Sequence, residues 1–240
     1  MILTSQQWSA FQSINRSRRS VRDFEDIEIP DQDISDILTE CLYAPSSANT
    51  QPFEIHWIKD QELKKKAAKA CNAQRAATQA NNLFVLVAST DIIRKTMNSY
   101  SDHIEQTTEL SERSKAYHFN IIRKIRIFLK IAPLIIWTPI IGFISWFFPS
   151  VSIQPFGALG VRNWAAKNSI FAAQTLLLAS VAKGYDACPM EGFNPVKLAS
   201  LLKLPYGSVI VMVIALGKKS PDARIEPQWR KDFNECVKIY

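Results

Sequence analysis

The chain has 240 residues, of which 47% are hydrophobic, and a formal net charge of +7. This composition suits a globular protein of one large or two small domains, and it excludes low-complexity and repeat classes. The four cysteines and three histidines are scattered without disulfide or metal-ligand spacing, so we expect buried, reduced thiols and no metal site.

The excess positive charge fits three kinds of partner: nucleic acid, an anionic lipid surface or an anionic cofactor. Much of it lies in two segments, residues 16–22 and 123–130. No helix-turn-helix, zinc finger or RNA-binding aromatic pair is present, so we expect no nucleic-acid partner. The N-terminus lacks the basic region of a signal peptide, and we therefore expect cytoplasmic residence.

The first half of the chain predicts three helices and two strands. Apolar residues recur at helical spacing after a cap at Thr4 or Ser5, and again after Pro30, while a third, alanine-rich segment is more polar. These helices are expected over residues 4–16, 30–45 and 61–80. One segment alternates and another is continuously apolar, as half-buried and fully buried strands do. The strands are expected over residues 53–60 and 82–90.

The second half contains a long helix, residues 163–184, which is apolar over most of its circumference and should be buried on most sides. It ends at Gly184, a typical C-cap residue. A short amphipathic helix, a central strand over 207–217 and a tail with a basic cluster follow. The chain has no GxGxxG, GxxxxGK[ST] or GxSxG motif, so we expect no Rossmann nucleotide site.

The middle of the chain contains a stretch without charge between Lys130 and Arg162. Residues 131–148 are nearly all apolar, which is long enough for a membrane span of about 17 to 25 residues. Three prolines argue against one straight helix, and the break at Pro133 predicts two pieces. These are a basic amphipathic helix over 117–130 and an apolar helix over 134–148.

Three polar clusters are candidates for ligand binding. "RSRRSVRDF", 16–24, begins with four arginines and two serines in seven residues, and these groups match phosphate oxygens. "APSSANTQP", 44–52, can lay backbone and hydroxyl groups against a flat ligand. "CPMEGF", 188–193, contains Gly192, which permits close approach of a ligand. Each cluster alone is a weak indication, because each also fits a solvated surface turn or loop, and for the arginine cluster composition alone slightly favours the surface turn.

Together, these clusters, the long apolar helix and "VIALG" followed by a late basic residue resemble the FMN-dependent nitroreductase family in order and spacing. The resemblance covers about residues 13–90 and 161–232. It implies the α+β class, with a three-layer fold of a central mixed sheet flanked by helices, in a single domain over residues 1–240. Residues 95–160 are not covered, and we expect them to form a hydrophobic helical insertion. The resemblance also implies a homodimer with FMN between its subunits and the helix 163–184, including Leu177, at its centre.

The resemblance assigns cofactor-binding residues by motif. The first cluster would contact phosphate and ribityl, the partner's second cluster would lie along the isoalloxazine, the third would face flavin N5, and a late arginine would close on the phosphate. These residues are Arg18, Arg19, Ser20, Arg22, Pro45, Ser46, Ser47, Asn49, Pro189, Met190, Glu191, Gly192 and Arg230. Asn72 or Gln74 matches the amide near the flavin's pyrimidine edge, and Phe53 replaces the family's common tryptophan.

The function implied by the resemblance is that of an FMN-dependent NAD(P)H oxidoreductase, with NADH or NADPH as reductant and no catalytic triad or metal. It would reduce nitroaromatic, quinone or similar electron-poor acceptors by ping-pong hydride transfer through flavin N5. Two alternatives stay open. One is a membrane-surface quinone reductase on the same scaffold, and the other is a flavin-binding or sensor protein without turnover.

The apolar stretch has three interpretations. Motifs on both sides of it would surround one FMN, so the resemblance excludes a single membrane crossing. Residues 119–149 would then form a lid over the flavin, or contact the inner face of the membrane peripherally, or do both and admit a lipophilic acceptor. In the second case the basic residues lie at the headgroups, with Trp137 and Trp146 as interfacial anchors.

Overall fold

The computed structural model describes residues 5–149 and 155–240. Four strands form one sheet in the order β1-β2-β4-β3, and each neighbouring pair is antiparallel. A single-residue parallel bridge joins Ser20 to Ala187 at the β3 edge. The strands are β1 (Phe53–Ile58), β2 (Asn82–Ala88), β3 (Asp186–Met190) and β4 (Val209–Gly217).

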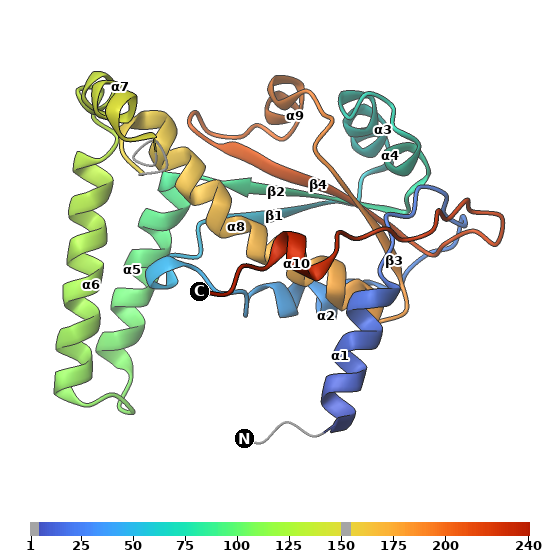
Figure 1. Cartoon of the computed structure of the whole chain (residues 1–240), viewed down its shortest axis with the longest axis horizontal. Helices are drawn as coiled ribbons and strands as arrows, with labels where there is room; N and C mark the ends of the chain where they lie inside the picture. Colours follow the sequence, from blue (N-terminus) through green and yellow to red (C-terminus); the bar gives the residue numbers. More distant parts are fainter. Residues whose placement is uncertain (1–4, 150–154) are drawn as a thin grey trace.

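Helices cover both faces of the sheet (Figure 1). They are α2 (Asp31–Cys41), α3 (Gln61–Ala70), α4 (Arg75–Gln79), α8 (Gly157–Ala182) and α9 (Pro195–Leu201). Alternate residues of a strand point to opposite faces. On β2, Leu83 and Val85 pack with α3, α4 and α9, whereas Phe84 and Leu86 pack with α2 and α8. The predicted α+β class with three layers is therefore confirmed, and β2 is apolar throughout because both of its faces are buried.

The segment between β2 and α8 forms a helical hairpin that projects from the sheet, with a third helix across its end (Figure 1). Its elements are α5 (Thr90–Gln106), α6 (Glu112–Ile131) and α7 (Trp137–Phe147). The predicted break near Pro133 is confirmed, although the basic helix begins earlier than expected. Residues 150–154 lie outside the described residues. Among the helices that the structure describes, none is long and apolar enough to cross a membrane.

Three sequence-based expectations need correction. The helix expected over 61–80 is interrupted, because Asn72 and Ala73 have left-handed φ angles of 56° and 49°. β3 was not expected, since it contains Pro189. As an edge strand it tolerates a residue that lacks an N–H. Cys236 is exposed, whereas the other three cysteines are buried as predicted.

α8 has 26 residues and begins at Gly157, six residues earlier than expected. One face packs against the chain's own core, where Leu177 is 5% exposed. On other faces Leu159, Ile170 and Phe171 are 72%, 39% and 49% exposed. These residues, rather than Leu177, are available to a second subunit. α1 (Ser5–Ser17) packs beside α8, and Thr4, the alternative cap, lies outside the described residues. The last helix, α10 (Phe233–Cys236), is in the tail.

Gly217, at the end of β4, lets an aromatic ring pack directly on the strand. A Cβ at Gly217 would lie 2.6 Å from the Phe24 ring and 2.9 Å from the Asn81 amide oxygen. Phe24 is only 8% exposed and forms an antiparallel bridge with Lys219. The contact therefore fastens the segment that follows the arginine motif to the sheet.

We predict that Gly217→Ala lowers the free energy of unfolding by about 1 to 3 kcal/mol, because the added methyl group overpacks the Phe24 ring. Chemical denaturation of the variant and the wild type measures the difference. Gly142→Ala is the control, since a Cβ there has nothing within 4 Å, and it should be neutral or slightly stabilising. Equal stability of Gly217→Ala and wild type would contradict this packing.

Candidate functional site

The arginine motif lies along the β3 edge of the sheet. Because Ser20 bridges to Ala187, the flanking arginines come close to Cys188. Burial raises the pKa of the Cys188 thiol, and the charges of Arg22 and then Arg18 partly oppose that rise. Asp23 forms an ion pair with Arg75 rather than with Arg22. The expected basic cluster is therefore present and is not neutralised by its own neighbouring acid.

Arg18 is a half-buried member of this cluster. Burial lowers its pKa, and the charges of Arg230 and Arg19 lower it further, so the late arginine from the tail reaches the same place. The Arg18 Nη1 atom is buried without a hydrogen-bond partner. Within the described part of the chain, none of these three arginines forms an ion pair with an acid. A partly buried guanidinium with an open donor among like charges is suited to an anion.

The other two arginines are held by neutral oxygens. Arg19 donates to the backbone carbonyls of Arg16 at 2.7 Å and Arg18 at 3.1 Å. In its best-satisfied orientation, the Gln228 amide oxygen accepts from Arg19 at 2.9 Å and from Arg230 at 3.0 Å. These contacts position the guanidinium groups without cancelling their charge.

The loop that contains Pro45–Asn49 is anchored to α8 by a buried amide. Asn168 is 5% exposed, and its side-chain oxygen accepts the Ser47 backbone N–H at 2.8 Å. The Ser46 hydroxyl accepts the Gln51 N–H at 3.0 Å. Sequence analysis missed Asn168, although an asparagine on the apolar part of the long helix was a usable indication.

This loop has an unusual backbone. Ala48, Asn49 and Gln51 have φ angles of 53°, 53° and 37°, which non-glycine residues seldom adopt. Such conformations persist only where surrounding contacts enforce them, and they concentrate at functional sites. Pro45, Ser47 and Asn49 are exposed, so the loop presents its strained part outward.

The segment that follows β3 is held by two amides. Asn72 donates to the Gly192 carbonyl at 3.0 Å and Gln74 donates to it at 2.7 Å. The sequence left the choice between these two amides open, and the structure places both on one carbonyl. Glu191 and Gly192 are exposed, whereas the Met190 side chain is 4% exposed and belongs to the core. Pro189 is half-buried within β3 itself.

The predicted site residues fall into two separate groups within one chain. Ala187, beside the arginines, pairs with Leu216 of β4. The 45–49 loop leads into β1 at the opposite end of the sheet, where Ala88 pairs with Val209. These two positions on β4 lie roughly 20 Å apart at the rise of a strand. The chain therefore gathers the arginines and the β3 segment, but it does not bring the loop to them.

Comparison with known proteins places the chain in a family. The family model described as "Nitroreductase family" matches residues 16–218. The chain belongs to the nitroreductase family. As a member of this family, the protein is an oxidoreductase.

Known proteins match most of the chain. It is 28% identical over 208 residues to protein DrgA of Synechocystis, covering 86% of this chain and 82% of DrgA. It is 26% identical over 200 residues to NADH dehydrogenase of Thermus thermophilus, covering 83% and 82% of the two chains. Its fold matches a protein of Exiguobacterium sibiricum solved in complex with FMN, with a TM-score of 0.75, 21% identity and coverage of 100% and 99%.

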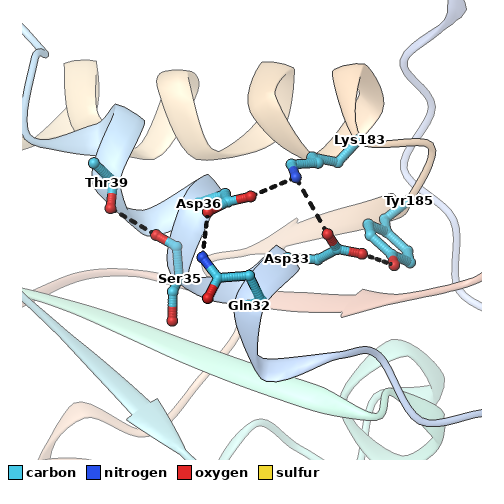
Figure 2. Close-up of polar contacts among 7 residues, drawn as sticks. All are labelled: Gln32, Asp33, Ser35, Asp36, Thr39, Lys183 and Tyr185. Atoms are coloured by element: carbon cyan, nitrogen blue, oxygen red, sulfur yellow. Dashed lines mark hydrogen bonds and ion pairs between the residues drawn. The ribbon is translucent and has the colours of Figure 1, made fainter.

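A polar cluster fixes the turn that leads into β3 (Figure 2). Lys183, at the end of α8, pairs with Asp33 at 3.2 Å and also with Asp36, both on α2. The Tyr185 hydroxyl donates to Asp33. Tyr185 and then Lys183 lower the pKa of Asp33, and Lys183 is the main cause of the lowered pKa of Asp36. In the nitroreductase fold of this chain, the cluster ties α2 to the strand that carries the third motif.

This cluster predicts a defined pH dependence of stability. Because the folded-state pKa values of Asp33 and Asp36 are lowered, their contribution is present above the unfolded carboxylate pKa of about 3.9 and is lost as pH falls through the folded values. We predict that Lys183→Met is less stable than wild type at neutral pH and that the difference shrinks below about pH 4.

Thermal denaturation of both proteins between neutral pH and pH 3 checks this dependence. Lys167→Met is the control, because Lys167 is an exposed lysine of the same helix with no ion pair in the described residues. A constant stability difference across that pH range would show that the cluster does not act through its carboxylates.

Proposed function

We propose that this chain is an FMN-dependent oxidoreductase that uses NADH or NADPH to reduce nitroaromatic, quinone or similar electron-poor acceptors. The observation that carries the proposal is the open Nη1 donor of the partly buried Arg18, which lies beside Arg19 and Arg230 without an acid partner. The FMN phosphate is a dianion and matches this charge and donor chemistry. The FMN-bound structural relative and the relative named NADH dehydrogenase support the same conclusion.

The residues around the arginines fit the remainder of the cofactor. Ser20 and Arg22 would contact the ribityl chain beside the phosphate-binding arginines. The segment ending at Gly192, held by the two amide side chains, would hold the flavin's edge. Bound there, FMN would supply hydride transfer between the nicotinamide and the acceptor. The protein's part is to bind the cofactor, orient it and limit what reaches it.

The arginine assignment predicts weak FMN binding in Arg18→Ala. Loss of a charge-assisted contact of about 1.5 to 3 kcal/mol should weaken FMN binding roughly ten- to a hundredfold. Titration of the apoprotein with FMN, followed by flavin fluorescence, measures the change. Arg113→Ala, which removes an exposed arginine at the start of α6, should bind FMN as wild type does. Unchanged affinity in Arg18→Ala would remove Arg18 from the site.

Steady-state oxidation of NADH and NADPH separates the enzyme from a flavin-binding or sensor protein. FMN-loaded protein should consume the nucleotide continuously when a nitroaromatic or a quinone is supplied. Bound flavin that is reduced once and is not reoxidised by either acceptor would favour the sensor interpretation.

We further propose that a second copy of the chain completes the site. Within one chain the 45–49 loop is anchored at the opposite end of the sheet from the arginines, so the loop would serve the partner's cofactor. α8 also exposes Leu159, Ile170 and Phe171. Large apolar side chains gathered on a helix surface are typical of an interface between subunits.

The dimer proposal predicts that Phe171→Asp shifts the protein to monomer and lowers its FMN content, because a charge would be buried at the interface. Sedimentation velocity together with the flavin absorbance of each species measures both effects. Val196→Asp is the control, since Val196 is 77% exposed on α9. Wild-type protein that sediments as a flavin-loaded monomer would contradict the proposal.

A further inference from the structure

The end of the helical hairpin carries a continuous apolar surface, residues 134–148, which we call the apolar tip. α7 contains no buried residue. Ile135, Phe143 and Trp146 of the tip are 85%, 71% and 84% exposed. No charged residue occurs between Lys130 and Arg162, and Thr138 and Ser145 are the polar side chains of the tip. An exposed apolar surface of this extent marks an interaction site.

The inner side of the tip is fixed to the protein. The Trp137 ring packs on Phe156, with 5.1 Å between ring centroids, and its Nε1 donates to the Ile131 carbonyl at 2.9 Å. The Gly157 N–H donates to the Ala132 carbonyl at 2.7 Å. These contacts orient α7 across the start of α8, so its outer side faces away from the fold.

Charges are separated along the hairpin beneath the tip. Four exposed basic residues lie within about 12 Å of the end of α6, at 1.5 Å per helical residue. They are Arg123, Lys124, Arg126 and Lys130. The acids of the hairpin lie mostly at its far end, namely Asp102, Glu105, Glu109 and Glu112. At the near end of α5, Asp91 is paired with Arg94.

These basic residues remain available to an anionic partner. Arg123 and Arg126 donate to the neutral side chains of Asn120 and Asn98 at 3.2 Å and 2.9 Å. In the part of the chain that the structure describes, none of the four forms an ion pair with an acid. The apolar tip therefore adjoins a helix end that carries four basic residues without acid partners.

We propose that the apolar tip inserts into one leaflet of an anionic membrane, with the basic end of α6 at the headgroups. The 11 residues of α7 are too few to span a bilayer, but they can lie in its interface. Trp146 is suited to the boundary between headgroups and acyl chains. Each nearby basic side chain adds attraction to anionic lipid.

Charge selects lipid over a second copy of this chain as the occupant. A second copy that covered the tip with its own tip would bring an identical basic end toward the first. Headgroups of anionic lipids instead complement the four basic residues, and the acyl boundary accepts apolar side chains without requiring a matching groove. The proposal rests on the tip alone and does not depend on the flavin site.

Vesicle flotation of the purified full chain, without detergent, tests the proposal. The probes are vesicles of phosphatidylcholine alone and of phosphatidylcholine mixed with phosphatidylglycerol, at low and high salt. The wild type should float with the anionic vesicles, and salt should weaken its binding. The double variant Phe143→Ser/Trp146→Ser should lose flotation. Val196→Ser, which removes an exposed apolar side chain from α9, should float as wild type does.

A charge variant provides a second test that leaves the apolar surface intact. Lys124→Glu/Lys130→Glu should partition into anionic vesicles at least tenfold more weakly, since each basic residue near the surface contributes about fivefold. Circular dichroism spectra and flavin content equal to those of the wild type show that both variants are folded.

Membrane docking would be overturned if the wild type floated under no condition, or if neither double variant reduced its flotation. A wild-type oligomer that does not float and that Phe143→Ser/Trp146→Ser dissociates would show instead that another copy covers the tip.

Discussion

Positive charges repel one another at the β3 edge, and the neighbouring contacts must hold the arginine segment there against this repulsion. Arg18 is partly buried beside Arg19 and Arg230, and its open donor faces no acid in the described residues. The backbone bridge at Ser20 and the ring of Phe24 hold the segment in place despite this repulsion. An anion that binds there relieves the unfavourable charge only in the folded chain, so its binding and the protein's stability are linked.

Hydrophobic periodicity identifies most of the helices and the strands β1, β2 and β4, because their burial imposes a pattern on the sequence. It fails where the backbone departs from that pattern. The left-handed residues Asn72 and Ala73 interrupt a helix without glycine or proline, and the short edge strand with Pro189 has no alternation. Motifs indicated the arginines and Gly192 as candidate site residues. Asn168 could not be found in this way, because its role depends on a contact with Ser47, which lies 121 positions away in the chain.

α8 connects the helical hairpin with the strained loop. At its first residue, the Gly157 N–H donates to the Ala132 carbonyl and so joins α8 to the end of α6. Further along the helix, the Asn168 side chain accepts the Ser47 N–H and holds the strained loop. These two points are 11 residues apart, or about 16 Å along the helix. A tip held at the membrane would therefore place the loop near the lipid surface. On the proposed function, a lipophilic acceptor could then reach the site without passing through bulk water.

The close contact between Gly217 and Phe24 has a consequence for divergence within the nitroreductase family. The space above Gly217 is filled by the ring, so a larger residue at that position requires a smaller one at position 24. Neither change is tolerated easily alone, because one overpacks the core and the other leaves a cavity. The two positions should therefore covary among relatives that keep this edge of the sheet. During evolution, Phe24 should be replaced by a smaller residue before Gly217 is replaced by a larger one.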